Sequence, residues 1–324
     1  MRAVTVATHG HCFDGLASAV VFSDLYAATH PGVDVAWNYR GFDYVARDAG
    51  VSEADLDGED NAILDYRYTR SDRLTYYFDH HATAFRTDAD REAFFAGAPA
   101  MGFFEAEGSS CTKLIARVAE ERFGVTIARE DDLVEWADRI DSARFDDVAE
   151  IVMSPPPALQ LASYVERFGS NDVLPSLVAR LRTGTIADAL ADDEIAARVK
   201  RLAKEKRAGL DVQREVAREL GEIVTCDLTQ HGPLTVEKFG LYALFPRARY
   251  TTQLFASDGR VKLSVGYNPW SQKSCEHHIG ELLRQFGGGG HKVVGGASFA
   301  SREEALSAVA IMTTALSTPP TRRP

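Results

Sequence analysis

The sequence has little cysteine and no long apolar segment at its start. The four cysteines are scattered and form no Cys-x-x-Cys pair (Cys12, Cys111, Cys226 and Cys275). This argues against a disulfide framework or a structural zinc site, and it favours a reducing compartment. No N-terminal run is long and apolar enough for a signal peptide or a membrane span. We therefore expect a soluble, cytoplasmic protein without a membrane partner.

Basic residues are scarce relative to acidic ones. The chain has 36 Lys and Arg against 47 Asp and Glu, which makes its formal net charge −11. Long nucleic acids are held mainly by contacts between phosphates and Lys or Arg. The composition therefore argues against a broad basic surface for long nucleic acid, and it leaves room for a small phosphate ligand in a local pocket.

The pattern of apolar residues divides the 324-residue chain into three parts. Residues 1–155 alternate strand-like and helix-like runs, which predicts an α/β fold with a mostly parallel, doubly wound sheet. Three consecutive prolines, 155–157, break this pattern. Residues 156–222 are expected to form a helical linker. Residues 223–318 are expected to form a smaller α/β domain across a cleft from the first.

Individual elements follow from periodicity and turn signals. The predicted helices cover residues 14–26, 112–123, about 130–140, 158–168, 174–182, about 186–220, about 276–286 and about 302–316. The predicted strands of the second domain cover residues 223–226, 241–245, 252–255 and 261–265, with a hairpin turn at Asp258-Gly259.

Polar residues stand where three β-like, apolar runs end. The runs lead into His9, into Asp65 and into Asp79-His80-His81. In open α/β sheets, chemistry collects beyond the carboxyl ends of the strands. Imidazole and carboxylate ligands together suit a divalent metal of intermediate hardness, such as manganese.

Some of these acids also have structural explanations. Asp14 opens a predicted helix, where Asp is a favoured N-cap, and Asp65 could form a turn. The pair His80-His81 is harder to explain without a metal. Asp138 and Asp141 end a predicted helix, where acids oppose the helix dipole and do not serve stability.

A run of four glycines, Gly287 to Gly290, ends in His291. Glycine lets backbone N–H groups approach an anion closely and adopts positive φ. A merely flexible loop needs no histidine at its end. We therefore interpret the run as a phosphate-binding loop and not as a packing feature.

In combination, these motifs resemble the DHH phosphoesterase superfamily with its associated C-terminal domain, of the nanoRNase and RecJ type. The segment from His9 to Gly15 looks like the motif His-Gly-x-Cys-x-Asp-Gly, and Asp65 matches the second motif. Asp79-His80-His81 matches the third. The fourth motif falls at Asp138 and Asp141, and the glycine run with His291 matches the C-terminal domain. The resemblance extends from residue 4 to about residue 300.

The resemblance implies a metal centre with Mn²⁺, as one or two ions, and Mg²⁺ or Co²⁺ would suit the same ligands. Asp65 would bridge the two ions. The first ion would take His9 and Asp14 besides Asp65, and the second His80 and the fourth-motif acid, for which Asp141 is preferred and Asp138 is the alternative.

The resemblance also implies roles outside the metal ligands. Asp79 would orient a histidine, and His81 would contact the scissile phosphate. The substrate-binding residues would be Gly288, Gly289, Gly290 and His291.

One position departs from the family pattern. Many members carry Asp-x-Asp in the first motif, and here Leu16 replaces the second acid. The second ion therefore loses an expected ligand, for which His11 could compensate. We expect a dinuclear but asymmetric site.

These observations favour metal-assisted hydrolysis of a small phosphodiester, such as a short oligonucleotide or linear dinucleotide cut to mononucleotides. An exopolyphosphatase is the first alternative and would need a basic lining, for which the candidates are Arg67, Arg144, Lys273, Arg284 and Lys292. The second alternative is a non-catalytic nucleotide sensor, which Leu16 favours. The sequence leaves a homodimer open.

Overall fold

The computed structural model describes residues 1–43, 50–97, 99–106, 108–257 and 259–319. The chain forms two compact units, one of Met1–Phe145 with Pro156–Val199 and one of Asp146–Pro155 with Lys200–Pro324. None of the described helices combines the length and the apolar character that crossing a membrane requires.

The first unit is built on a five-stranded sheet in the order β2-β1-β3-β4-β5, and every neighbouring pair is parallel. This confirms the predicted parallel sheet. The strands are β1 (Arg2–His9), β2 (Val35–Phe42), β3 (Asp60–Leu64), β4 (Tyr76–Asp79) and β5 (Met101–Phe104).

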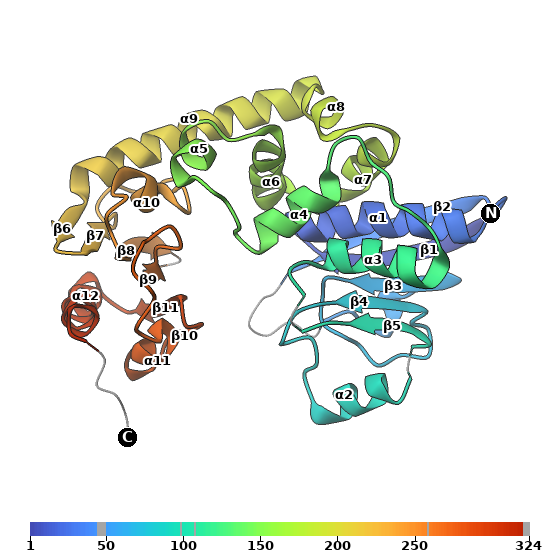
Figure 1. The fold of residues 1–324 in the computed structure, drawn as a ribbon, viewed down its shortest axis with the longest axis horizontal. Helices are drawn as coiled ribbons and strands as arrows, with labels where there is room; N and C mark the ends of the chain where they lie inside the picture. The colour runs from blue at the N-terminus through green and yellow to red at the C-terminus, as the bar shows by residue number, and fades with distance from the viewer. Residues whose placement is uncertain (44–49, 98, 107, 258, 320–324) are drawn as a thin grey trace. The chain divides into compact units, whose positions relative to one another are not determined.

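Helices cover both faces of this sheet, with α1 and α3 on one face and α2 on the other (Figure 1). Alternation along the strands supplies both cores: Val6 and Leu64 pack with the α1 and α3 face, whereas Ala7 and Ile63 pack with the opposite face. The helices are α1 (Phe13–Thr29), α2 (Asp88–Phe95), α3 (Cys111–Phe123), α4 (Leu133–Asp141), α6 (Pro157–Phe168), α7 (Leu174–Thr183) and α8 (Ile186–Leu190), with a 3₁₀ turn η1 (Glu53–Asp55).

Helices α6 to α8 belong to the first unit, although we expected a linker from residue 156. Their apolar faces explain this placement, because Leu161, Leu177 and Ile186 are buried in the same core as α1. A solvated linker would have left these side chains exposed to water, at a cost of about 1.5–3 kcal/mol each.

The second unit contains a six-stranded sheet in the order β10-β11-β9-β8-β7-β6. Only the pair β7 and β8 is parallel among the described strands of this sheet. The strands are β6 (Arg218–Leu220), β7 (Ile223–Asp227), β8 (Tyr250–Ser257), β9 (Arg260–Tyr267), β10 (Gly289–Gly290) and β11 (Val294–Phe299).

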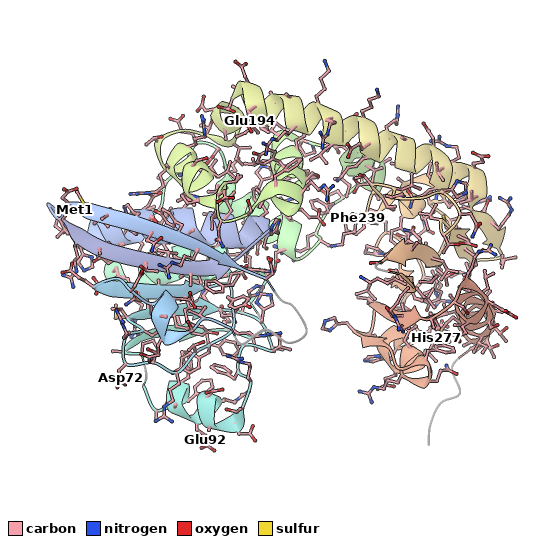
Figure 2. All side chains as sticks on the ribbon, turned by 180° about the vertical axis from the view of Figure 1, so that it is seen from behind. Met1, Asp72, Glu92, Glu194, Phe239 and His277 are labelled. Carbon is pink, nitrogen blue, oxygen red and sulfur yellow. The ribbon has the colours of Figure 1, made fainter. Side chains whose placement is uncertain are left out.

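The helices of the second unit complete its core. They are α5 (Val148–Met153), α10 (Gly240–Leu244), α11 (Ile279–Leu283), the 3₁₀ turn η2 (Arg284–Phe286) and α12 (Arg302–Ser317), while α9 (Asp193–Val216) begins in the first unit and ends in the second. His277, which is labelled in Figure 2, precedes α11. It is buried, with only 7% of its surface exposed.

Three predicted elements of the chain were wrong in type or extent. Residues 241–245 lie mostly in helix α10 and not in a strand, and the long helix expected over 186–220 is interrupted after α8 and ends before β6. The helix expected over 276–286 is shortened to α11 and η2. The predicted pairing of β8 with β9 is confirmed. Of the expected turn between them, Asp258 lies outside the described residues.

Candidate metal centre

The carboxyl ends of three adjacent strands bring the predicted residues together. β1 pairs with β3 and β3 pairs with β4, in registers that place Thr8 beside Leu64 and Leu64 beside Phe78. The residues that follow these three in the chain are His9, Asp65 and Asp79. The shared register therefore lines these three residues up along one edge of the sheet.

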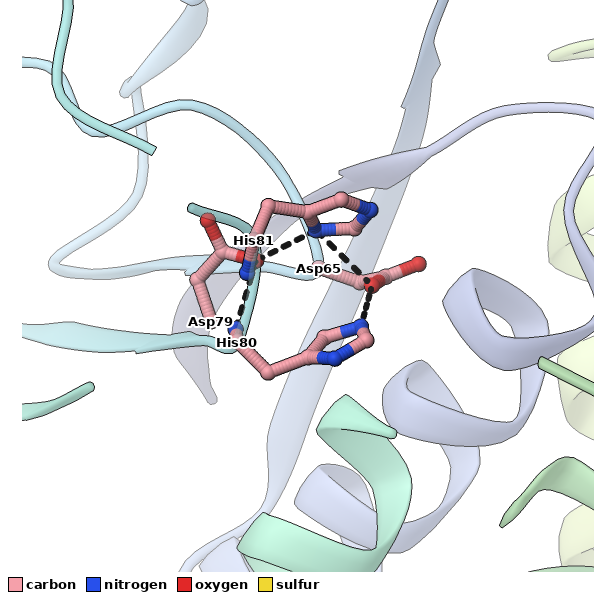
Figure 3. A group of neighbouring side chains, drawn as sticks. All are labelled: Asp65, Asp79, His80 and His81. Carbon is pink, nitrogen blue, oxygen red and sulfur yellow. Dashed lines mark hydrogen bonds and ion pairs between the residues drawn. The ribbon is translucent and has the colours of Figure 1, made fainter. Parts of the chain in front are cut away.

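Asp65 lies at the centre of the group. Its Oδ2 is 3.6 Å from His9 Nδ1. Its Oδ1 is 3.4 Å from His80 Nε2 and 3.7 Å from His81 Nδ1 (Figure 3). One oxygen thus faces His9 and the other faces His80, which is the geometry that a bridging carboxylate requires.

The backbone of Asp65 is in the left-handed region, with φ of 55°. Asp adopts this region more readily than most residues, although it is still uncommon. The Asp65 N–H donates to the Phe78 carbonyl oxygen over 2.9 Å, which ties the residue to β4. The turn at the end of β3 is therefore a strained conformation at the centre of the site, as is common where geometry serves function.

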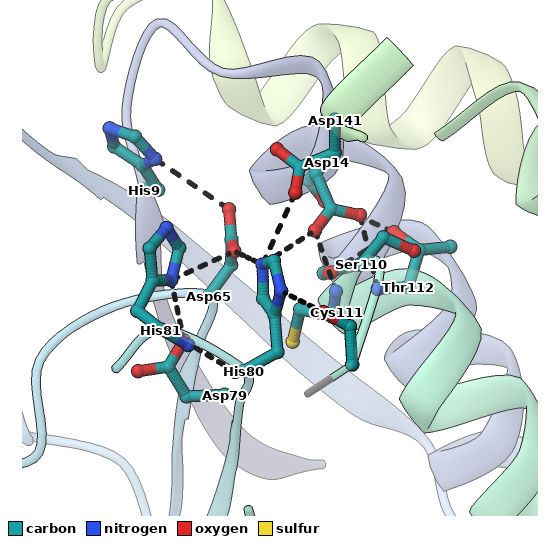
Figure 4. Close-up of polar contacts among 12 residues, drawn as sticks. His9, Asp14, Asp65, Asp79, His80, His81, Ser110, Cys111, Thr112 and Asp141 are labelled. Atoms are coloured by element: carbon teal, nitrogen blue, oxygen red, sulfur yellow. Dashed lines mark hydrogen bonds and ion pairs between the residues drawn. The ribbon is translucent and has the colours of Figure 1, made fainter. Parts of the chain in front are cut away.

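Asp14, His80 and Asp141 form the other side of the group (Figure 4). His80 Nε2 lies 3.4 Å from Asp141 Oδ2 and 3.8 Å from Asp14 Oδ2. We expected Asp14 to act with His9, but its carboxylate is placed with His80 and Asp141.

Asp14 is held by the first turn of α3. Its two oxygens accept the backbone N–H groups of Cys111 and Thr112 over 2.7 and 3.1 Å. Gly15 makes this placement possible, because a Cβ there would lie 2.2 Å from the carbonyl oxygen of His9. Helix α1 can therefore begin directly against the end of β1.

His80 presents Nε2 to the carboxylates because its other nitrogen is engaged. Nδ1 lies 3.0 Å from the Gly108 carbonyl oxygen, which can only accept a hydrogen bond. Nδ1 therefore keeps its proton, and loss of the proton on Nε2 would offer the Nε2 lone pair to an ion.

Asp79 faces the backbone and His81. Its Oδ1 accepts the N–H groups of His80 and His81 over 2.8 and 3.2 Å and lies 2.8 Å from His81 Nδ1. Its Oδ2 accepts the Tyr77 hydroxyl over 3.0 Å. This arrangement suits the orienting role that the resemblance implied.

The electrostatics of the group call for a cation. Burial and the Asp65 charge raise the pKa of Asp14 well above its usual value and raise the pKa of Asp141 to about 6. Burial opposes protonation of His80, but Asp65 and Asp14 raise the pKa of this ring to about 10. Burial likewise opposes ionisation of Asp65, yet His80 and His9 hold the pKa of this carboxyl well below its usual range.

Buried donor atoms without hydrogen bonds point to the same conclusion. Within the described part of the chain, neither carboxylate oxygen of Asp65 nor Nε2 of His80 makes a hydrogen bond, although Asp65 is only 1% exposed. Buried polar groups are nearly always satisfied. The donor set of carboxylate and imidazole therefore fits a divalent metal ion.

The structure separates the two acids of the fourth motif. Asp141 lies in the group, whereas the Asp138 carboxylate is engaged elsewhere, by the Lys113 ammonium at 2.8 Å and by Ser109 and Arg144. Despite its burial, these partners lower the pKa of Asp138. Asp138 therefore belongs to an ion-pair network, and the alternative that made it a ligand finds no support in this geometry.

Leu16, which replaces the second acid of the first motif, belongs to the hydrophobic core. Leu16 is 0% exposed and packs in the main hydrophobic cluster. His11 Nδ1 lies 3.1 Å from the Glu166 carbonyl oxygen, and His11 joins none of the metal-capable groups of the described residues. The residue that does join one is Cys12, with His9 and Asp65. We had not considered it, although it stands in the same loop as His9 and Asp14.

The glycine run forms a tight hairpin in the second unit, and our argument against packing was wrong. A Cβ at Gly288 would lie 2.3 Å from the Gly296 carbonyl oxygen, and Gly290 has φ of 141°. Close backbone contact between β10 and β11 thus requires glycine at both positions. Gly289 differs, because a Cβ there would meet nothing within 4 Å among the described atoms. Substrate binding by this segment and His291 stays a prediction.

No protein-family model and no curated protein sequence matches the chain. Solved structures do match it. It is similar to a pGpG-specific phosphodiesterase from Vibrio cholerae, with 18% identity and a TM-score of 0.71 over 99% of this chain and 100% of that one. It is also similar to exonuclease RecJ bound to manganese, with 15% identity and a TM-score of 0.51 over 98% and 91% of the two chains.

A third match is RecJ from Thermus thermophilus in complex with Mn²⁺, with 15% identity and a TM-score of 0.56 over 99% of this chain and 53% of that one. The chain therefore has the fold of the DHH phosphoesterase superfamily, as the sequence motifs predicted.

Proposed function

We propose that the chain is a divalent-metal-dependent phosphodiesterase that cuts a linear dinucleotide or a short oligonucleotide to mononucleotides. One observation carries this proposal: Asp65 stands between His9 and His80, with Asp14 and Asp141 on the His80 side. Mn²⁺, as one or two ions, is the proposed cofactor, and Mg²⁺ and Co²⁺ suit the same oxygen and nitrogen donors.

An ion bound by these ligands would supply Lewis acidity and lower the pKa of a water molecule. The side chains prepare the site for it: Asp65 offers one oxygen to each side, and His80 is held in the tautomer that exposes Nε2.

His81 is the group we assign to the scissile phosphate. Burial opposes protonation, but Asp79 and Asp65 raise the pKa of this ring above its usual value. A protonated ring would keep one N–H on Asp79 and direct the other, on Nε2, away from it. Such a donor can stabilise charge on a phosphoryl oxygen or on the leaving oxygen.

Residues that follow His81 in the chain line a hollow. It has a volume of about 440 Å³ and is lined by Ala82, Phe85, Arg86, Thr87, Asp88 and Arg91. Its lining begins one residue after His81, and it combines two guanidinium groups with an aromatic ring. This chemistry suits one phosphate and one base.

Two further observations favour a dinucleotide. The fold extends over the whole length of a phosphodiesterase described as specific for pGpG. The polyphosphate alternative has weaker support, because two of its five candidate basic residues are paired with acids, Arg144 with Asp138 and Lys273 with Glu222.

The test is hydrolysis of pGpG and of a labelled RNA series of two to about ten nucleotides, with and without Mn²⁺. We expect mononucleotides from the shortest substrates, and loss of activity in Asp65→Ala. Asp60→Asn is the matched control, because Asp60 is a buried acid at the opposite end of the same strand.

Other outcomes would replace the proposal. Turnover of polyphosphate but of no nucleotide would make the chain a phosphoanhydride hydrolase. Metal and nucleotide binding without any turnover would favour the sensor.

A further inference from the structure

We propose that Cys12 is a metal ligand, and that the His9 side of the centre takes an ion of the zinc type through His9, Cys12 and Asp65. This inference rests on the proposed metal centre and deepens it. It makes the two sides chemically different, with nitrogen, sulfur and oxygen donors on one side and only nitrogen and oxygen donors on the other.

The geometry brings the three donors to one point. Ligand atoms of His9, Cys12 and Asp65 all lie within 4.8 Å of one another. Zinc binds histidine nitrogen, cysteine sulfur and carboxylate oxygen at about 2.0–2.3 Å, so two ligands of one tetrahedral ion are about 3.3–3.6 Å apart. The distance of 3.6 Å between His9 Nδ1 and Asp65 Oδ2 agrees with that spacing.

The surroundings of Asp65 are independent evidence that an ion binds here. It is only 1% exposed, and among the described atoms its Oδ2, the oxygen nearest His9, makes no hydrogen bond. Asp65 therefore provides a buried acceptor on the side where the Cys12 thiol lies.

The local chain explains why a cysteine stands at this point. Cys12 is the N-cap residue of α1, with extended backbone angles of φ −120° and ψ 135°. Ser, Thr, Asn and Asp are the residues that stabilise a helix from this position. A cysteine there contributes little to capping, but it adds the soft donor that a zinc-type ion prefers.

The other cysteines are placed differently. The Cys111 thiol donates to the Phe78 carbonyl oxygen over 3.3 Å, and Cys226 and Cys275 lie in the second unit. Cys12 is the cysteine that joins a metal-capable group among the described residues. Three protein ligands leave one tetrahedral position open, which is typical of catalytic zinc sites.

Coordination changes the protonation of Cys12 only. Its sulfur binds as the thiolate, and the thiol proton passes to solvent. No oxidant or reductant is needed.

Cobalt provides a test that does not depend on activity. The chelated protein is loaded with Co²⁺, and its near-ultraviolet spectrum is recorded, because a thiolate ligand produces a charge-transfer band that oxygen and nitrogen ligands do not. We expect the band in the unmodified protein and in Cys111→Ser, and its loss in Cys12→Ser and Cys12→Ala.

Affinity measurements provide a second readout. Cys12→Ser is expected to weaken Zn²⁺ binding by at least about tenfold and to change Mn²⁺ binding much less, because thiolate favours the softer ion. Circular dichroism would verify that the variants are folded.

The possible results separate the two proposals. Bound Co²⁺ without a charge-transfer band in the unmodified protein would overturn the role of Cys12 and leave the metal centre in place. If no Co²⁺, Zn²⁺ or Mn²⁺ binds at all, both proposals are wrong.

Discussion

The Asp79 carboxylate is bound to His81: its Oδ1 lies 2.8 Å from His81 Nδ1. The same oxygen accepts the backbone N–H groups of His80 and His81. A single carboxylate oxygen therefore sets both the backbone turn after β4 and the orientation of the ring assigned to the phosphate.

Asp79→Asn should lower kcat by about 10- to 100-fold, because losing the carboxylate beside a functional histidine typically costs that much. We expect the number of bound metal ions to stay unchanged. Steady-state kinetics with metal analysis measures both quantities. Loss of the metal together with activity would show that Asp79 is itself a ligand.

Asp141→Asn and Asp138→Asn should have different consequences, although the two acids are three residues apart. Asp141→Asn should lower metal affinity by at least about tenfold, since Asp141 lies 3.4 Å from His80 Nε2. Asp138→Asn should instead lower the free energy of unfolding by about 1–3 kcal/mol, because it removes hydrogen bonds between charged groups. Metal titration and denaturant unfolding of both variants decide between the assignments, and reversed results would make Asp138 the ligand.

Gly289→Ala should test the glycine run without disturbing its packing. A methyl group at Gly289 has no neighbour within 4 Å among the described atoms, so we expect an unchanged melting temperature. If a phosphate approaches this backbone, KM should rise about tenfold, equivalent to about 1.4 kcal/mol. An unchanged KM would mean that the run serves packing alone.

Gly288→Ala is the matched comparison for this experiment. Its Cβ would collide with the Gly296 carbonyl oxygen, and overpacking of this kind costs about 1–3 kcal/mol. The second unit should therefore melt at a lower temperature.

His277 should make the second unit sensitive to mild acid. Burial lowers the pKa of this ring. The unfolded chain takes up a proton near the ordinary histidine pKa of about 6.5, whereas the folded protein resists it. The unfolded state then binds more protons, so stability falls as the pH falls below that value.

His277→Phe should remove this part of the pH dependence, and its ring can keep the edge contact with Tyr250. Melting temperatures at pH 8 and pH 5.5 measure the effect, with the exposed His231→Gln as control. If the melting temperatures of the unmodified protein and of His277→Phe fall by the same amount between pH 8 and pH 5.5, His277 is not the cause of the acid sensitivity.

Ala143→Gly should stabilise the first unit by about 0.5–1 kcal/mol. Ala143 has φ of 50°, in the left-handed region, which is unfavourable for residues with a Cβ by about 1–2 kcal/mol. Glycine removes this strain, but its greater backbone freedom also stabilises the unfolded state, which offsets part of the gain. Denaturant unfolding measures the difference. Ala197→Gly in the exposed part of α9 should have the opposite sign.

The strand ends were the part of the site that the sequence predicted best. His9, Asp65 and Asp79 each follow an apolar β-like run, and parallel strands bring such positions to one edge. No information about side-chain contacts was needed to predict that these three residues lie together.

The choice between Asp138 and Asp141 could not be made in this way. Residues three apart on a helix face the same side, so periodicity treats them alike. Lys113, on a different helix, engages Asp138 and leaves Asp141 beside His80. Contacts between distant segments of this kind are not visible in local sequence.

The segment 241–245 shows another limit. Five apolar residues fit a buried strand or a buried helix equally well, since a run this short does not reveal its period. The structure forms α10 over Gly240–Leu244, and Leu241 of this helix shares a buried hydrophobic cluster with Val224 of β7.

The two oxygens of the Asp14 carboxylate accept backbone amides of α3, and the Thr112 hydroxyl donates to the Asp14 carbonyl oxygen. A change of residue at Cys111 would leave its N–H group in place, whereas a change at Thr112 would remove the hydroxyl. A displacement of α3 as a body would move both N–H groups together. Metal occupancy should therefore report the position of α3. A mutation, a ligand or a temperature change that shifts this helix should alter the amount of bound metal, even when the change acts far from the centre.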